Sequence, residues 1–135
     1  MFKNTLIAYA AALLAMAVLD ALWLGLLAKP MYQQGIGHLM AEQPKIPAAV
    51  VFYLLFPVGL MVFAVQPGAA VVPGWQACLG AAALYGLFTY ATYDLSNLAT
   101  LKNWPVSLAV IDIAWGMFIS TASAAAGKFA LASVR

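Results

Sequence analysis

The residues of this chain best suited to chemistry are three aspartates that lie within long apolar stretches. Asp20, Asp94 and Asp112 are three of only four acidic residues in the sequence. An aspartate at the centre of a membrane helix costs roughly 2.5–3.5 kcal/mol on insertion scales. Acids at such positions therefore indicate a binding site, or hydrogen-bonded groups that face other helices.

Aromatic and amide side chains accompany each acid at helical spacing. Trp23 follows Asp20 by three residues and Trp115 follows Asp112 by three. Residues three or four apart share a helix face, so we expect an indole N–H near each of these acids. Tyr90 and Asn97 flank Asp94 in the same way, with Tyr93 in a neighbouring stripe. The predicted pocket consists of Asp20, Trp23, Tyr90, Tyr93, Asp94, Asn97, Asp112 and Trp115.

Several kinds of chemistry fit such a pocket. Three ionised carboxylates would repel one another, so at least one should carry a proton, which suits a proton relay or general acid/base work. A bound Na⁺, Ca²⁺ or Mg²⁺ would instead keep the acids ionised, since hard cations prefer oxygen ligands. An organic cation could also be held between carboxylates and aromatic rings. The alternative is that the acids have only a structural role, in which each polar contact between membrane helices stabilises the fold by about 0.6 kcal/mol.

Signals for other chemistries are missing from the sequence. The chain has one cysteine, Cys78, and its one histidine, His38, lies outside the apolar segments, which argues against a zinc or iron site. No nucleophile–base pair, phosphate loop or nucleotide fingerprint is visible. The sequence therefore identifies no cofactor and no catalytic residue, and it leaves open whether the protein is an enzyme.

The composition is that of a membrane protein. Hydrophobic residues make up 66% of 135 positions and charged residues only 7%, with a mean hydropathy of +0.96. Soluble domains carry about 25% charged residues. The net charge of +2 is too small to indicate nucleic-acid binding. The partner that the composition implies is the lipid bilayer.

Four apolar segments predict the elements that position the acids, at about residues 6–28, 47–65, 75–98 and 104–127. Backbone groups in lipid must be satisfied internally, so these segments should be helices. Short connections favour antiparallel neighbours. We expect one all-α domain, an up-down bundle of four transmembrane helices. The second span should end at Gln66-Pro67-Gly68, and the connection 29–45 should contain a short interfacial segment.

This topology predicts that the three acids share one half of the membrane. Asp20 lies past the middle of the first span, on the side of the 29–45 connection. Asp94 lies near the end of the third span, and Asp112 about two turns into the fourth. The hinge at residues 99–103 joins these two spans. In an up-down bundle both connections lie at the same end.

Lysine and arginine do not decide the orientation. Each end carries three of them: Lys3, Lys128 and Arg135 at one, and Lys29, Lys45 and Lys102 at the other. The uncharged middle turn and the terminal charges favour cytoplasmic termini. Four short helices enclose little volume, so we expect a homo-oligomer or a partner in a membrane complex.

Three runs of residues resemble a known family. They are Asp-Ala-Leu-Trp-Leu-Gly at 20–25, Thr-Tyr-Asp-Leu-Ser-Asn-Leu-Ala-Thr at 92–100 and Asp-Ile-Ala-Trp-Gly at 112–116. They look like the marks of a bacterial membrane family known as domain of unknown function 2177, and the resemblance covers essentially the whole chain. It implies a four-span protein of the bacterial inner membrane, with no established activity, cofactor or substrate.

Three functions follow as hypotheses. The first is binding or transport of a proton, a cation or a small cationic molecule in the predicted pocket. The second is an enzyme, or an enzyme subunit, that acts on a lipid or another apolar substrate with an Asp and a Tyr as acid and base. The third is a structural or assembly partner whose acids only hold helices together.

Overall fold

The computed structural model describes residues 2–69 and 74–134, and this part of the chain is almost entirely helical. The elements in order are α1 (Phe2–Leu22) with a π-helical turn (Trp23–Leu27), α2 (Lys29–Ile36), a 3₁₀ turn (Gly37–Leu39), α3 (Ile46–Leu60) with a π-helical turn (Met61–Val65), α4 (Gln66–Ala69), α5 (Gly74–Thr100) and α6 (Val106–Ser133). The prediction of an all-α protein is confirmed.

Three stretches in the described residues are long and apolar enough to cross a membrane. They are Phe2–Leu27, Ile46–Gly68 and Val106–Ser133. The remaining predicted span, 75–98, lies in α5, a helix of 27 residues. Its second half carries Tyr, Thr, Asp, Ser and Asn side chains, which make it the most polar of the long helices.

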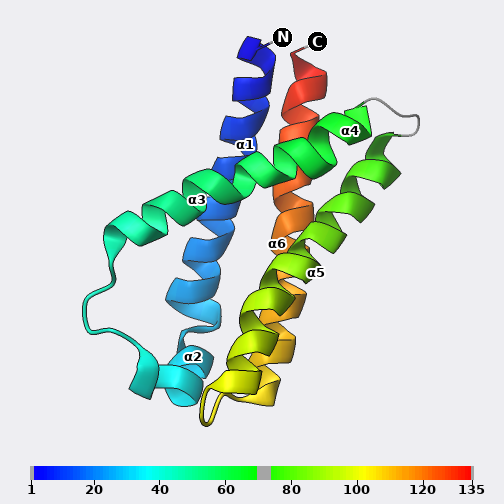
Figure 1. The fold of residues 1–135 in the computed structure, drawn as a ribbon. Helices are drawn as coiled ribbons and strands as arrows, with labels where there is room; N and C mark the ends of the chain where they lie inside the picture. Colours follow the sequence, from blue (N-terminus) through cyan, green and yellow to red (C-terminus); the bar gives the residue numbers. More distant parts are fainter. Residues whose placement is uncertain (1, 70–73, 135) are drawn as a thin grey trace.

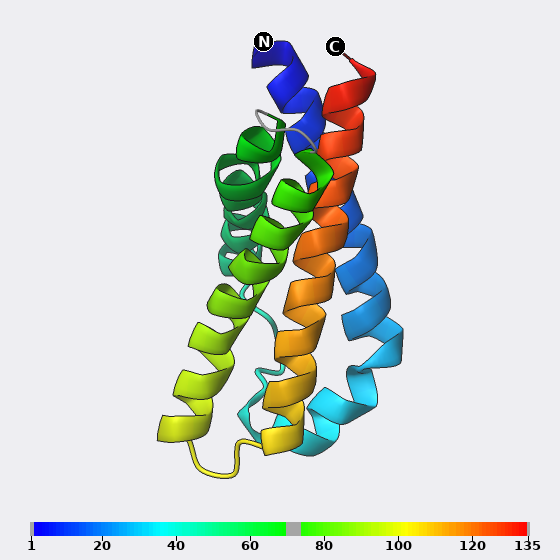
Figure 2. The same cartoon turned by 90° about the vertical axis from the view of Figure 1, so that its right-hand side faces the viewer.

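The long helices run antiparallel, as predicted. Figure 1 shows the chain running away from the termini in α1, returning in α3 and α4, running away again in α5 and returning in α6. The N- and C-termini therefore lie at the same end, and α2 lies at the other. Helix α6 packs against both α1 and α5 (Figure 2).

Helix α3 departs from the regular bundle that the sequence predicts. It begins near mid-height and crosses the other helices obliquely toward the end that holds the termini (Figures 1 and 2). Residues 40–45 lead back from the α2 end before α3 begins, with Lys45 extended ahead of the first helical turn. Pro44 favours this course, because a proline disfavours helical backbone in the residue before it. Pro47 lies in the first turn of α3, where its missing N–H costs no hydrogen bond. Only α1, α5 and α6 therefore continue to the α2 end.

Two of the predicted segment ends need correction. Gln66-Pro67-Gly68 does not break the second helical segment after Val65, because these residues are themselves helical in α4. A π-helical turn at Met61–Val65 precedes α4. Such a turn shifts the backbone hydrogen bonds, so the helix can continue although a proline within it removes one donor. Helix α6 continues beyond residue 127 to Ser133. The hinge after α5 lies where expected, with Asn103 in the left-handed region at φ 60°.

Helix α2 is a short helix within the 29–45 connection, as predicted, and it is anchored to the start of α6. Ile36 of α2 is buried in a cluster with Trp104, Leu108 and Ala109. A Cβ atom on Gly35 would lie 3.0 Å from Pro105 Cγ, so a glycine allows this close approach. The anchor fixes the position of Tyr32 beside the acids.

Candidate functional site

The three acids are buried in the half of the bundle that contains α2. Asp20 is 6% exposed, Asp94 0% and Asp112 5%. They project from α1, α5 and α6. Asp112 is close enough to both other acids for their charges to interact. The structure therefore brings the three acids together around Asp112.

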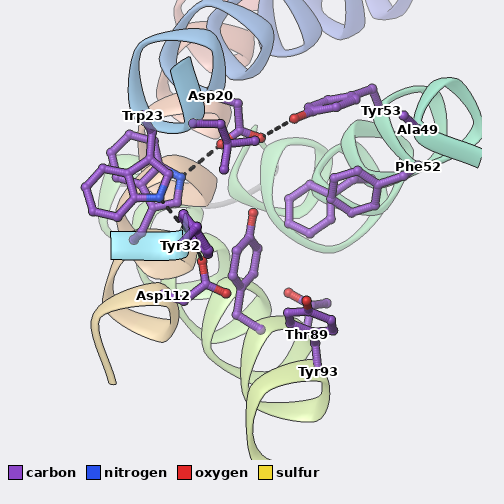
Figure 3. Close-up of a pocket in the computed structure, with 13 residues that line it drawn as sticks. Asp20, Trp23, Tyr32, Ala49, Phe52, Tyr53, Thr89, Tyr93 and Asp112 are labelled. Atoms are coloured by element: carbon purple, nitrogen blue, oxygen red, sulfur yellow. Dashed lines mark hydrogen bonds between the residues drawn. The ribbon is translucent and has the colours of Figure 1, made fainter. Parts of the chain in front are cut away.

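Asp20 is held by two hydrogen bonds from two different helices. The Trp115 indole of α6 donates to Oδ1 over 2.9 Å, and the Tyr53 hydroxyl of α3 donates to Oδ2 over 2.7 Å (Figure 3). Since both oxygens accept a bond, the carboxylate is fixed in one orientation. The same bonds connect α1 to α3 and to α6.

Asp112 is held from α2. The Tyr32 hydroxyl donates to its Oδ1 and accepts a bond of 3.3 Å from the Trp23 indole. Burial raises the pKa of the Tyr32 hydroxyl above its usual range, and the hydrogen bond to Asp112 raises it further. Tyr32 therefore stays protonated near neutral pH and remains a donor.

Each tryptophan connects to the acid of the other helix and not to the acid that it follows in the chain. Trp23 follows Asp20 in the chain but reaches Asp112 through Tyr32, while Trp115 follows Asp112 but donates to Asp20. The two indoles stack with their centroids 4.4 Å apart and their planes 5° from parallel. Each acid does have an indole nearby, as expected, but the bonds run between elements. Spacing along one helix could not reveal that exchange.

Asp94 differs from the other two acids. It is fully buried, and within residues 2–69 and 74–134 no N–H or hydroxyl donor reaches either of its carboxyl oxygens; the Asp112 carboxyl can bond to it only through a shared proton. Buried polar groups are hydrogen-bonded in the large majority of cases, so this one calls for an explanation. Its nearest charged neighbour is Asp112.

A cavity of about 620 Å³ borders Asp20 and Asp112 (Figure 3). It lies under the start of α3. Of the residues predicted for the pocket, it is lined by Asp20, Trp23, Tyr90, Tyr93, Asp112 and Trp115. Asp94 neighbours Asp112 but is not part of this lining. Asn97 is half-buried and does not reach the cavity wall, because it lies one turn beyond Asp94 toward the end of α5.

The rest of the lining was not predicted from the sequence. It consists of Leu24, Tyr32, Ala49, Phe52, Tyr53, Phe56 and Thr89. Two features of the sequence could have indicated these residues. The aromatic residues of α3 recur at helical spacing, and Tyr32 lies in the connection expected at this end. A smaller cavity of about 450 Å³ shares Asp20, Leu24 and Tyr53 with the first, so Asp20 borders both.

The ring of Tyr90 fits in the cavity wall because the residue beside it on α6 is a glycine. Any Cβ atom on Gly116 would collide with the Tyr90 ring. The ring also meets the Phe56 ring nearly at right angles, with centroids 6.1 Å apart. The glycine thus lets α5 and α6 approach each other while a large ring stays at the site.

Residues 5–129 match the family model DUF2177, described as a predicted membrane protein. This chain belongs to the DUF2177 family. No curated protein and no solved structure matches it. The DUF2177 protein is thus a multi-pass membrane protein with buried aspartates that tyrosine and tryptophan side chains hydrogen-bond.

The described residues do not form a metal site of the usual ligand types. In the two described stretches of the DUF2177 protein, no three or more His, Cys, Asp or Glu side chains are grouped so that they could hold a metal ion. The side chains that could contact a ligand are the carboxylates of Asp20 and Asp112, the tyrosine hydroxyls and the aromatic faces.

Proposed function

We propose that this DUF2177 protein binds a small organic cation in the 620 Å³ cavity, with Asp20 and Asp112 as its counter-charges. The single observation that carries the proposal is that two carboxylates border one cavity whose other walls are mainly aromatic. Aromatic faces attract cations, and the attraction grows to about 2 kcal/mol or more where water is excluded. A carboxylate and a ring together suit an ammonium group with an apolar body.

The size and lining of the cavity favour an organic ligand over an inorganic ion. Small-molecule sites typically occupy about 300–1,000 Å³ and have mostly apolar walls with a few polar groups. A calcium ion takes roughly 6–8 oxygen ligands at short range. Most of the cavity surface is apolar although several side chains that line it carry oxygen, and both oxygens of Asp20 already accept bonds from Tyr53 and Trp115.

The hydrogen bonds prepare the carboxylates for a ligand. Asp20 is fixed from α3 and α6, and Asp112 is fixed from α2. A ligand that meets acids already oriented loses less free energy in ordering them. Binding of this kind is also the first step of transport, so the same cavity suits a carrier.

Location and assembly complete the proposal. We place the protein in the bacterial inner membrane with both termini in the cytoplasm. A second copy, or a partner in a membrane complex, would cover apolar side chains that α3 and the π-helical turn after it expose, such as Val51, Leu55 and Phe63.

An enzyme acting on a lipid or another apolar substrate is the second candidate. The observation in its favour is the direct hydrogen bond between the Tyr32 hydroxyl and Asp112 at the cavity wall, because a tyrosine and an acid in contact can act as an acid/base pair. Comparing the lipids of cells with and without the gene tests this reading, and identical lipid profiles count against it. A purely structural role is the third candidate, in which each Asp→Asn change only lowers the melting temperature.

Tryptophan fluorescence offers a direct test of cation binding, since Trp23 and Trp115 line the cavity. The purified protein in detergent would be titrated with tetramethylammonium, benzyltrimethylammonium and tetrabutylammonium. We expect a saturable change with at least one of them, and binding weaker by about 30-fold or more in Asp20→Asn and Asp112→Asn.

The matched control is Glu42→Gln. Glu42 is the fourth acidic residue and is exposed outside the cavity, so its substitution should leave binding unchanged. The proposal fails if no probe gives a saturable response. It also fails if the two aspartate variants, folded as judged by circular dichroism, bind as well as the parent protein.

A further inference from the structure

Asp94 is a buried titratable group that has no role in the proposed cation site. It does not line the cavity, it is completely buried, and no N–H or hydroxyl donor in the described part of the chain reaches its two carboxyl oxygens. An unpaired ionised carboxylate in such surroundings is strongly disfavoured. Asp94 therefore has a reason to hold a proton, and Asp112 beside it is the group with which it can share one.

The surroundings of Asp94 identify the groups that influence this proton. Asp112 faces it from α6, Tyr32 from α2, and Tyr93 lies on its own helix. Asp20 of α1 acts on it indirectly, through Asp112. These neighbours are acids or phenols. Two close carboxyl groups cannot both ionise cheaply, so the pair favours one shared proton.

Building on the proposed cation site, we infer that the Asp94–Asp112 pair is a proton site whose proton is exchanged for the organic cation. When the cation enters beside Asp112, its positive charge stabilises the ionised pair. The O–H bond of the shared carboxylic acid breaks, the proton leaves to water, and both acids become carboxylates. One positive charge enters and one leaves, so the net charge of the site is conserved.

Tyr32 offers a way out for the proton. Its hydroxyl bonds directly to Asp112, and α2 lies outside the spans at the end of the bundle. In the resting site this hydroxyl donates to Asp112 and accepts from Trp23, so it must first turn away from Asp112. The phenol oxygen then accepts the proton of the acid and releases its own hydrogen to water in the cavity that Tyr32 lines. The exchange couples two ligands through Asp112: the cation in the cavity that it lines and the proton that it shares with Asp94.

Isothermal titration calorimetry tests this coupling. The probe is benzyltrimethylammonium, whose charge does not depend on pH, so a pH effect must come from the protein. Titrations in buffers of different ionisation enthalpy, between about pH 5 and 9, count the protons released. We expect release of about one proton per cation over part of this range, and an affinity that rises by up to about tenfold per pH unit there.

Asp94→Asn is the variant that isolates the proton site. An amide of the same shape carries no exchangeable carboxyl proton, so proton release should fall close to zero and the affinity should no longer rise with pH. Glu42→Gln, a change at an exposed acid, should behave like the parent protein. If Asp94→Asn does not fold, the proton count of the parent protein decides alone.

The outcomes separate the two proposals. Binding without proton release, or the same release from Asp94→Asn, overturns the exchange and leaves the cation site standing. Absence of any binding overturns both. Proton release that is lost in Asp94→Asn and retained in Glu42→Gln supports the exchange.

Discussion

The two halves of the bundle are built from the same three long helices, yet they differ in how those helices are packed. In the terminal half, which contains the chain ends, α1, α5 and α6 are joined by α3 and α4. Its buried positions are largely small side chains: Ala8, Ala12, Ala64, Cys78, Ala82 and Ala124. Small residues let membrane helices approach closely, and the described part of this half is tightly packed.

The α2 half, which contains Asp20, Asp94 and Asp112, lacks most of the fourth helix. Only the start of α3 reaches it, where large rings and two hydrogen-bonded acids border a cavity of about 620 Å³. The closely packed half thus holds together the helices that frame the open site. The cavity is the space that the oblique start of α3 leaves beside the other three helices.

The largest expected effect comes from removing a charge in the α2 half. Asp112→Asn takes away the carboxylate that borders the cavity, accepts the bond from Tyr32 and neighbours Asp94. Loss of one partner of a buried charge pair costs about 2–5 kcal/mol, so binding of a quaternary ammonium probe should weaken by about 30-fold or more. Fluorescence titration measures this, and an unchanged affinity would remove the reason to treat this half as a site.

A pair of matched substitutions compares the packing of the two halves. Ala12→Phe inserts a ring into a fully buried position of the terminal half, which should cost about 1–3 kcal/mol through overpacking. Ala49→Phe inserts the same ring at the wall of the cavity, where space exists, and should cost less than about 1 kcal/mol while blocking the probe. Melting temperatures in detergent give the comparison. Equal losses would mean that the halves are packed alike.

Tyr32→Phe tests the link between α2 and the acids. It removes the donor to Asp112 and the acceptor for Trp23, so we expect a loss of about 1–3 kcal/mol. The pH dependence has a definite sign. Because the pKa of Tyr32 is raised in the folded protein, its contribution is complete below its unfolded pKa of about 10 and is lost as the pH rises above that value.

Melting curves of the parent and Tyr32→Phe proteins measure this contribution. The difference between them should be full near about pH 7 and should shrink above about pH 10. A difference that grows at high pH would contradict the assigned role of this hydroxyl.

The smallest effect is expected from Ser123→Ala in the terminal half. The Ser123 hydroxyl is buried and has no partner within the described residues, so the fold gains no hydrogen bond from it. Replacing it by a methyl group should change the stability by less than about 0.5 kcal/mol, or raise it. A clear loss of melting temperature would show that polar groups matter equally in both halves.

Much of the fold could be predicted because it follows from composition and chain direction. Apolar length gives the helices, and antiparallel order places Asp20, Asp94 and Asp112 toward one end. The oblique course of α3 could not be predicted in this way. It depends on how far the chain after Gly37 runs back along the bundle before Ile46 begins the helix.

Only part of the candidate site could be predicted, because its contacts also depend on how the helices pack. Helical periodicity shows which residues share a face, but it does not show which neighbouring helix that face meets. It therefore found the acids and their tryptophans but missed their crosswise pairing and the partners Tyr32 and Tyr53. It also placed Asn97 in the pocket, although that residue lies beyond the cavity wall.

Anomalous diffraction can test directly whether the α2 half binds an organic cation between Asp20 and Asp112, as we propose. Crystals of the protein would be soaked with 4-bromobenzyltrimethylammonium. We expect a bromine peak inside the aromatic cavity and the ammonium group against the two carboxylates. A cavity without density, or a bromine peak elsewhere on the molecule, would contradict it.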